Sequence, residues 1–177
     1  MKLRRYTSVR VNLKRIGIDL QEDDLSSYPF LYLTGLDDFS FSQNEIGELQ
    51  RYLNDGGVLL INNGLGLGTF DAAVRRELNK VLPNMTLQPI PTGHGLYSSL
   101  FDVSSVRYSP SLAKSKPELN NQPFLLGVTI DGELRVVYSP YDLEAGWLEV
   151  SYPMTKGYES ISSQRLGMNM IIYMMTH

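Results

Sequence analysis

A histidine and a distant aspartate are the residues best suited to acid–base chemistry. His94 lies in residues 91–95, a loop-like segment, and loops often carry functional groups. A general base needs a nucleophile and an orienting carboxylate within hydrogen-bond reach. Asp142 is the candidate carboxylate, and Ser98 or Ser99 is the candidate nucleophile. One hypothesis is a hydrolase that uses His94 with a carboxylate, with or without a metal ion. The alternative is a histidine that makes a structural hydrogen bond.

Two adjacent carboxylates, Asp37 and Asp38, follow an expected strand and precede an expected helix. Ligand sites of open α/β sheets lie at this edge, beyond the carboxyl ends of the strands. Mg²⁺ or Ca²⁺ would need more oxygen ligands than two aspartates supply. We therefore assign no metal ion. These carboxylates are candidate ligand contacts, and loop solvation near a helix N-terminus is the simpler alternative.

Three alternate glycines, Gly64, Gly66 and Gly68, occupy the turn between an expected strand and the next helix. Phosphate groups bind to helix N-termini at such turns. The turn lacks the Gly-Lys-Ser/Thr ending of a P-loop, and Thr69 stands where the dinucleotide fingerprint has its last glycine. We therefore predict no nucleotide or other cofactor. Asn63, Gly64 and Gly66 remain candidate ligand contacts because of their position.

Aromatic side chains gather around Asp142 in the last third of the chain, at Tyr138, Tyr141, Trp147 and Tyr152. Aromatic rings beside carboxylates suit the binding of a sugar or a peptide. They equally suit a loop that packs onto the core. Both interpretations stay open, and Asp142 and Trp147 are retained as candidate ligand contacts.

The elements that must position these residues alternate between strands and helices. Residues 30–34 and 58–62 are nearly continuous apolar runs, typical of strands covered on both faces. A helix is expected after each, from residue 42 to about 55 and from about 71 to 82. This order predicts an α/β domain with a doubly wound, mostly parallel sheet. Residues 9–14 alternate between apolar and polar side chains and predict a half-buried strand.

Local signals predict the ends and inward faces of the helices. Ser42 and Glu45 form a capping box, and Phe41 and Ile46 form a hydrophobic staple. Glycines 56 and 57 end that helix in the left-handed conformation. The inward-facing positions expected on the helices at 71–82 and 160–175 are Ala73, Val74, Leu78, Val81, Ile161, Leu166, Met170 and Ile171.

The part of the chain after residue 83 predicts a late hairpin. Residues 124–130 and 134–138 are strand-like, and the Asp-Gly pair between them is a hairpin turn signal. We therefore expect an antiparallel appendage late in the domain. A short strand is expected at 87–90. Residues 104–123 are rich in Ser, Pro and Asn and predict a long surface loop.

Composition excludes several classes of function. The 177 residues suit one domain, and the net charge of −3 gives no reason to expect a nucleic-acid partner. The chain has no cysteine, which excludes thiolate catalysis and disulfides. The longest apolar stretch, at 170–175, is far shorter than the roughly 20 residues that cross a bilayer. The sequence therefore predicts a soluble chain that does not span a membrane.

Short motifs follow one another in a set order along nearly the whole chain. They are YPFLYLTG at 28–35, FS at 41–42, RYL and GG within 51–57, FD and RREL within 70–78, HGLY at 94–97, D and GW within 142–147, and RLGMN and TH within 165–177. This series resembles domain-of-unknown-function family 4159. The resemblance implies a flavodoxin-like fold of the class I glutamine amidotransferase type, in mostly bacterial proteins. It implies no established activity.

Two departures from the family pattern bear on chemistry. Gly35-Leu36-Asp37 stands where members usually have Gly-His-Gly, and Asn62-Asn63-Gly64 stands where they often have acidic residues and sometimes cysteine. Amidotransferases carry their nucleophile on the turn after the latter strand. Here that turn holds only glycine and leucine, so acyl transfer lacks its nucleophile.

A third departure concerns the start of the chain. Leu3-Arg4-Arg5-Tyr6 resembles the tail of a helix, so we expect residues 1–177 to form one domain that lacks a strand and a helix present in a longer parent protein. An exposed strand edge would then be free to pair with a second copy, and a homodimer is one option. Many family members are exported or attached to membrane-anchored chains, so the compartment of the parent protein stays open.

The leading hypothesis is a non-catalytic module that binds a small ligand or a protein partner. Its ligand would contact loops at the carboxyl ends of the strands. The candidate contacts are Asp37, Asp38, Asn63, Gly64, Gly66, His94, Asp142 and Trp147. The hydrolase hypothesis requires that His94 lie beside a nucleophile or metal in a pocket.

Overall fold

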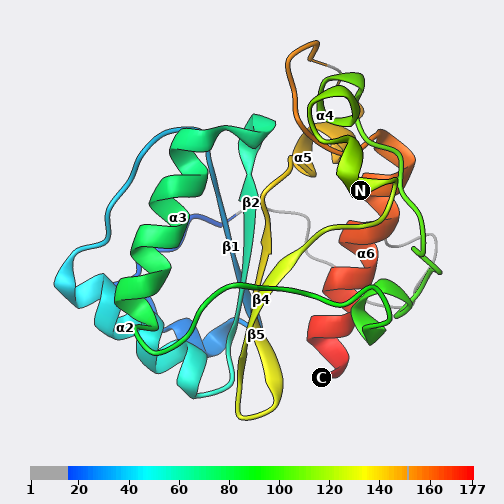
Figure 1. The fold of residues 1–177 in the computed structure, drawn as a ribbon. Helices are drawn as coiled ribbons and strands as arrows, with labels where there is room; N and C mark the ends of the chain where they lie inside the picture. The colour runs from blue at the N-terminus through cyan, green and yellow to red at the C-terminus, as the bar shows by residue number, and fades with distance from the viewer. Residues whose placement is uncertain (1–15, 151) are drawn as a thin grey trace.

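A central β-sheet with helices on both faces forms the domain (Figure 1). The computed structural model describes residues 16–150 and 152–177, so the strand predicted at residues 9–14 lies outside the described residues. Five strands of the described part form one sheet in the order β1-β2-β5-β4-β3. The prediction of a mixed α/β fold is confirmed.

The core of the sheet is parallel and one side of it is antiparallel. Strand β2 (Val58–Asn63) pairs in parallel with β1 (Phe30–Gly35) and with β5 (Glu133–Ser139). Strands β4 (Leu126–Ile130) and β3 (Gln88–Pro89) continue the sheet in antiparallel pairs. The carboxyl ends of β1, β2 and β5 therefore meet at one edge.

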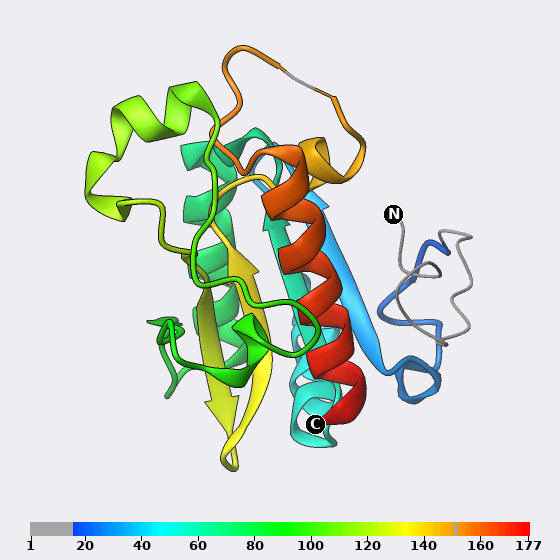
Figure 2. The same ribbon diagram turned by 90° about the vertical axis from the view of Figure 1, so that its right-hand side faces the viewer.

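Alternate residues of β2 serve the two halves of the core. Leu59 and Ile61 belong to the cluster packed under α2 (Gln43–Asn54) and α3 (Gly68–Val81). Val58 and Leu60 belong to the cluster packed under α6 (Ser160–Thr176). All six residues of β2 are buried, as its continuous apolar run predicts. Figure 2 shows α6 along its face of the sheet, with its N-terminus at the end where the parallel strands finish.

The capping box that begins α2 is confirmed. The Ser42 hydroxyl accepts a hydrogen bond from the Glu45 amide, and Glu45 Oε2 accepts one from the Ser42 amide at 2.7 Å. Gly56 ends this helix in the left-handed region with φ of 102°, whereas Gly57 has no positive φ. Local sequence was sufficient here because both partners of the cap lie within one helical turn.

The Asp-Gly hairpin is confirmed, but it is not an appendage. Asp131 and Gly132 have φ of 51° and 86°, as a primed hairpin turn requires. Strand β5 inserts between β2 and β4, with Leu60 opposite Val137. The hairpin therefore supplies the middle of the sheet. Turn chemistry sets the local bend, but the strand that β5 pairs with lies about 75 residues away, where local signals give no information.

Four further expectations are corrected. Helix α3 begins at Gly68, because a 3-10 turn, η2 (Gly64–Gly66), takes up the glycine segment. The expected loop at 104–123 contains α4 (Pro110–Ser115) and η4 (Pro117–Leu119). Strand β1 is not covered on both faces, since it is an edge of the described sheet and Tyr32 is exposed. Ile161 is 70% exposed because it lies in the first turn of α6, beyond the edge of the core.

The remaining short elements are η1 (Leu25–Ser27), η3 (Gly95–Tyr97) and α5 (Glu144–Trp147). Helix α5 packs on α6 near the carboxyl ends of the strands. Within residues 16–150 and 152–177, no helix combines the length and apolarity that crossing a membrane demands.

Candidate functional site

Polar side chains at the carboxyl ends of β2 and β5 bond to one another. Asn62 is the only polar residue among the first five of β2, and its side chain is completely buried. Its Nδ2 donates to Asp142 Oδ1 and to Thr34 Oγ1, both at 3.3 Å, and its Oδ1 accepts from the Leu143 amide at 2.8 Å. A buried amide must be bonded in this way to offset its loss of water. Asn62 therefore ties β1, β2 and the segment after β5 together.

Asp142 is 3% exposed and serves as a local cap. Besides the Asn62 amide, its Oδ1 accepts from the backbone amides of Glu144 at 2.8 Å and Ala145 at 3.4 Å. These two donors belong to the first turn of α5. The carboxylate lies one residue before the N-cap, Leu143, and it satisfies the first two backbone amides of α5.

Asn63 holds the turn that follows β2. Its Nδ2 donates to the carbonyls of Leu67 at 2.9 Å and Pro140 at 3.2 Å, and its Oδ1 accepts from the Leu67 amide at 3.1 Å. Within this turn Leu65 has φ of 56°, a left-handed value that is costly for leucine. The turn after β2 therefore carries the hydrocarbon side chain of Leu65, which has no nucleophilic atom.

Two glycines of this turn lie where backbone segments approach closely. A Cβ on Gly64 would lie 2.9 Å from the Gly35 carbonyl oxygen, at the end of β1. A Cβ on Gly66 would collide with the Lys156 carbonyl oxygen, and the φ of Gly66 is 66°. The Lys156 amide donates to the Leu65 carbonyl at 3.1 Å. Neighbouring backbone, rather than open space, therefore surrounds these two candidate contacts.

Trp147 lies against the same end of the molecule. Its Nε1 donates to the Ser163 carbonyl on α6 at 2.8 Å, and its ring lies 5.9 Å from the ring of Tyr32 on β1. The Ser163 hydroxyl donates to the Leu143 carbonyl. The indole therefore connects α5, α6 and the outer side of β1.

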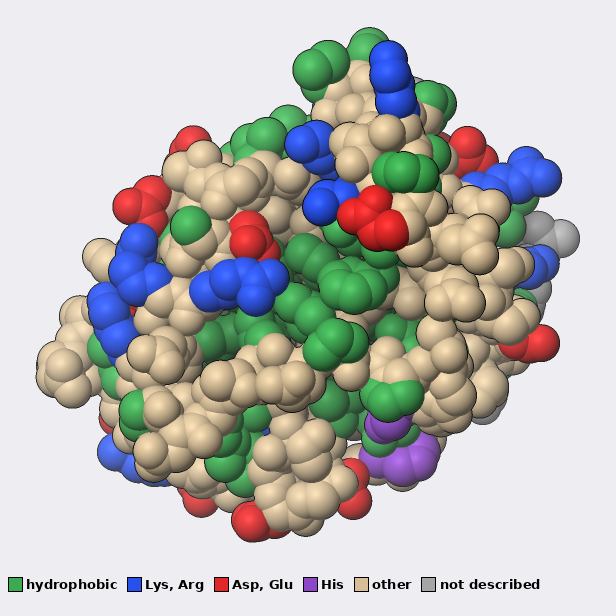
Figure 3. Space-filling model, in the orientation of Figure 1, with side chains coloured by type: hydrophobic (Ala, Val, Ile, Leu, Met, Phe, Trp, Pro, Cys, Tyr) green, Lys and Arg blue, Asp and Glu red, His purple; other side chains and the backbone are tan. Residues whose placement is uncertain are grey.

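His94 lies at the other end of α6 and does not meet Asp142. Its ring is 5.2 Å from the ring of Tyr173, near the C-terminus of that helix, whereas Asp142 lies beside α5, which bonds to Ser163. Ten helical residues separate Ser163 from Tyr173, a rise of about 15 Å. Figure 3 shows the two histidines as neighbouring purple groups near the lower edge of the molecule. The structure does not bring His94 and Asp142 together.

The ring nitrogen that His94 would need as a base is occupied. Its Nδ1 accepts a hydrogen bond from the Leu96 amide at 3.2 Å and caps η3. In the neutral ring the proton then sits on Nε2, which cannot accept one. Burial, and the nearby His177, lower the pKa of His94. Both nearby serine hydroxyls, Ser98 and Ser99, donate to the Gly95 carbonyl.

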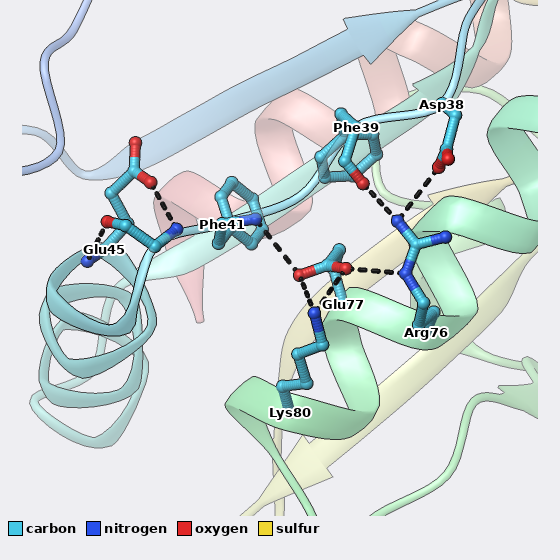
Figure 4. Close-up of polar contacts among 8 residues, drawn as sticks. Asp38, Phe39, Phe41, Glu45, Arg76, Glu77 and Lys80 are labelled. Carbon is cyan, nitrogen blue, oxygen red and sulfur yellow. Dashed lines mark hydrogen bonds and ion pairs between the residues drawn. The ribbon is translucent and has the colours of Figure 1, made fainter.

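Asp38 belongs to a separate ionic cluster between the β1–α2 segment and α3 (Figure 4). Its Oδ1 lies 2.9 Å from Arg76 Nη2, which also donates to the Phe39 carbonyl. Arg76 Nε donates to Glu77 Oε1 at 2.8 Å. The buried Glu77 also binds Lys80 Nζ and accepts from the Phe41 amide at 3.1 Å. This cluster fixes the segment that carries Asp37, which is exposed.

Hydrogen bonds stabilise the charged form of the Glu77 carboxyl group. Burial alone would raise the pKa of its carboxyl group, but hydrogen bonds from Lys80, Arg76 and the Phe41 amide outweigh burial and lower it. A buried, charged glutamate on a helix is stable only with such partners. Glu77 therefore acts as an anchor for the β1–α2 segment.

Metal-binding groups are sparse in the described ranges. Residues 16–150 and 152–177 contain no group of three His, Asp or Glu side chains placed to hold a metal ion.

Apolar side chains project beyond this end of the sheet. Residues 148–150 and 152–154 after α5, which we call the 148–154 loop, expose Leu148 by 60%, Val150 by 40%, Tyr152 by 55% and Met154 by 82%. Leu36 and Leu67, which follow β1 and η2, are also exposed. Figure 2 shows the orange stretches on either side of residue 151 at the end of the molecule where the parallel strands finish. The bond between Lys156 and Leu65 holds the return of this loop against η2.

The family model described as Domain of unknown function (DUF4159) matches residues 1–175. The chain belongs to the DUF4159 family. No curated protein matches it. The family relationship that the motif order suggested is therefore established. Membership brings no assigned activity to this DUF4159 domain.

Some residues of the DUF4159 site have signals in the sequence alone. Asn62 follows four apolar residues in a buried strand, and such a polar residue needs an internal partner. Glu77 lies next to Leu78 on α3, three residues after Val74 and four before Val81. These are inward-facing positions, so the helical spacing indicates that Glu77 is buried too. The exposed apolar residues of the 148–154 loop lie within seven residues of Trp147, but their exposure depends on tertiary packing.

Proposed function

We propose that this DUF4159 domain is a non-catalytic protein-binding module of amidotransferase-like architecture. The contact surface would be the 148–154 loop together with Leu36 and Leu67. The observation that carries this proposal is the exposure of large apolar side chains at the end of a sheet whose polar residues are bonded internally. Contiguous exposed apolar side chains are uncommon on monomers and mark interaction sites.

The composition of this surface supports a protein partner. Tyr152 and Met154 are residue types enriched at the centres of protein interfaces, where a few buried side chains supply most of the affinity. The buried Asn62 and Asp142 and the capped α5 hold the base of the loop firmly. A loop on a rigid support loses less conformational entropy on binding.

A small-molecule ligand is less well supported at this edge. Small-ligand sites are concave and usually measure about 300–1,000 Å³. A hollow of about 180 Å³ lies between α3 and β4, and one of about 350 Å³ lies at the amino end of β1. Neither is lined by the residues that surround the carboxyl ends of the strands. Gly64 and Gly66 pack against backbone instead.

The hydrolase hypothesis finds no support in the same geometry. His94 uses Nδ1 as a structural acceptor and lies near the far end of α6 from Asp142. The turn after β2 presents Leu65, which has no nucleophilic atom. An assay with an activated ester, with and without added Zn²⁺, should give equal rates for the wild type and for His94→Ala. A slower rate for the variant would favour the hydrolase.

The binding proposal is tested with a loop variant, Leu148→Ser/Tyr152→Ser/Met154→Ser. Proteins captured from source-cell extract by the immobilised domain would be purified and titrated calorimetrically against the wild type and the variant. We expect the variant to bind at least about tenfold more weakly, because each lost apolar anchor is worth more than about 1 kcal/mol.

A matched control removes exposed apolar groups from other parts of the surface. Ile16→Ser/Met175→Ser replaces two residues that are about half exposed and lie outside the loop. This variant should bind like the wild type. Equal binding by the loop variant and the wild type would contradict the proposal.

A further inference from the structure

Two histidines meet on one tyrosine at the C-terminal end of α6. His177 stacks on Tyr173, with ring centroids 4.3 Å apart and planes 13° from parallel. His94 approaches the same tyrosine at 5.2 Å from the 91–99 segment. These are the only two histidines of the chain. Histidine is the side chain whose charge normally changes between pH 5 and 8.

His94 also holds its own segment together through a bond that protonation destroys. Its Nδ1 accepts from the Leu96 amide, which caps η3. A protonated imidazole carries hydrogen on both nitrogens and cannot accept. Protonation would therefore place two donors, Nδ1–H and the Leu96 N–H, against each other.

The 91–99 segment covers buried side chains of α6. Leu96 and Tyr97 of η3 belong to the same core cluster as Met170 and Tyr173. The Tyr97 hydroxyl donates to the Ile90 carbonyl, and burial raises its pKa to about 12, so Tyr97 stays neutral near pH 7. Loss of the His94 cap would loosen this cover at one end.

We propose that His94 and His177 form a pH-sensitive lock that holds the 91–99 segment on the C-terminal end of α6 when both are neutral. Protonation removes the η3 cap and places two like charges around Tyr173. The segment then loosens from the C-terminal end of α6, while β2 stays paired with β1 and β5 because neither histidine belongs to those ladders.

Both acidic and basic groups lie near Tyr173 and the two histidines. Burial raises the pKa of the Tyr173 hydroxyl, and of the nearby charges on β5 Glu133 raises it further while Arg135 lowers it. The carbonyl end of α6 favours a positive charge, and His177 Nδ1 lies 3.2 Å from the Tyr173 carbonyl oxygen. The structural hydrogen bond of His94 requires a neutral ring, because Nδ1 accepts from the Leu96 amide.

Proton binding by His94 is linked to closure of the 91–99 segment, and this linkage gives the direction in which pH changes closure. The pKa of His94 is lowered by burial and by His177, so the open segment binds a proton more readily than the closed one. Closure is then fully favourable above the ordinary histidine value of about 6.5. It weakens as pH falls below that value towards the lowered pKa of the closed form.

Hydrogen exchange of the Leu96 and Tyr97 amides, measured on the full chain at pH 7.5 and pH 5 and corrected for intrinsic rates, tests the lock. We expect protection of these amides to fall about tenfold in the wild type, while amides of β2 keep their protection. His94→Asn preserves the cap, because asparagine is a good N-cap residue, but it cannot titrate. Its protection should not change with pH.

A proton NMR titration of the His94 ring adds a second readout that is made first on the wild-type chain. It should give a pKa below that of a model histidine, and His177→Asn should move it upwards. The proposal is overturned by protection that does not change with pH in the wild type, or by the same loss of protection in His94→Asn.

Discussion

Asn62 Nδ2 lies 3.3 Å from Asp142 Oδ1 and joins β2 to the segment after β5, across 80 residues of sequence. Asn62→Ala removes this bond and the acceptor for the Leu143 amide, and it leaves buried polar groups unpaired. We expect a loss of about 2 to 4 kcal/mol in the free energy of unfolding, measured by urea denaturation. The exposed Asn44→Ala on α2 is the control and should change stability by less than about 0.5 kcal/mol. Similar values for the two variants would show that the Asn62 network is not structural.

Glu77→Gln should destabilise the domain in a pH-dependent way. At pH 7 the variant loses the charge that pairs with Lys80 and Arg76, at an expected cost of about 2 to 4 kcal/mol. Because the pKa of Glu77 is lowered in the folded state, its stabilising effect is complete above the unfolded value near 4.5 and is lost as pH falls through the folded pKa. The stability difference between the wild type and the variant should therefore shrink in strongly acidic buffer.

Glu48→Gln provides the comparison for Glu77. Its partner Arg51 is mostly exposed, so the variant should lose less than about 1 kcal/mol at pH 7. A difference between wild type and Glu77→Gln that stays constant from pH 7 to pH 3 would contradict the assignment of a charged, paired Glu77.

Gly66→Ala should destabilise the domain by about 2 to 4 kcal/mol, because an alanine there would have a positive φ and its Cβ would collide with the Lys156 carbonyl. Gly68→Ala, two residues later, is the matched control. No atom lies within 4 Å of its added methyl group, and its φ is not positive, so the variant should be neutral or slightly stabilised. Thermal unfolding followed by circular dichroism distinguishes the two. Equal melting temperatures would mean that the η2 turn adapts freely.

Trp147→Phe should retain the contact with Tyr32 but lose the indole bond to the Ser163 carbonyl. We expect a loss of about 1 to 2 kcal/mol, and a loss of about 3 to 5 kcal/mol for Trp147→Ala, which also removes the packed ring. Chemical denaturation followed by far-ultraviolet circular dichroism measures both. If Trp147→Phe costs as much as Trp147→Ala, the indole hydrogen bond rather than the ring holds α5 on α6.

Sequence predicted the elements whose signals are local. The Ser42 cap depends on residues within one helical turn, and the Asp131 turn depends on backbone preferences of two residues. The buried strand at β2 followed from its continuous apolar run. These features need no knowledge of the rest of the fold, so they could be predicted with the correct residues.

The arrangement of the site depended on distant contacts and was predicted only in part. Asp142 and Trp147 do lie at the end of the sheet, but His94 lies near the far end of α6. A single sequence shows that His94 occupies a loop, but it does not show which end of the sheet that loop reaches. Asp38 was expected to be available for a ligand, whereas the structure pairs it with Arg76, 38 residues away.

The central position of β5 has a consequence for how the chain folds. Strand β2 is complete by residue 63, but its neighbour β5 does not begin until residue 133. During synthesis the ribosome must therefore add about 70 residues while one side of β2 has no permanent partner. Long-range pairing of this kind slows folding and exposes strand edges to aggregation. The nascent N-terminal half is thus the stage at which a chaperone would have most to protect.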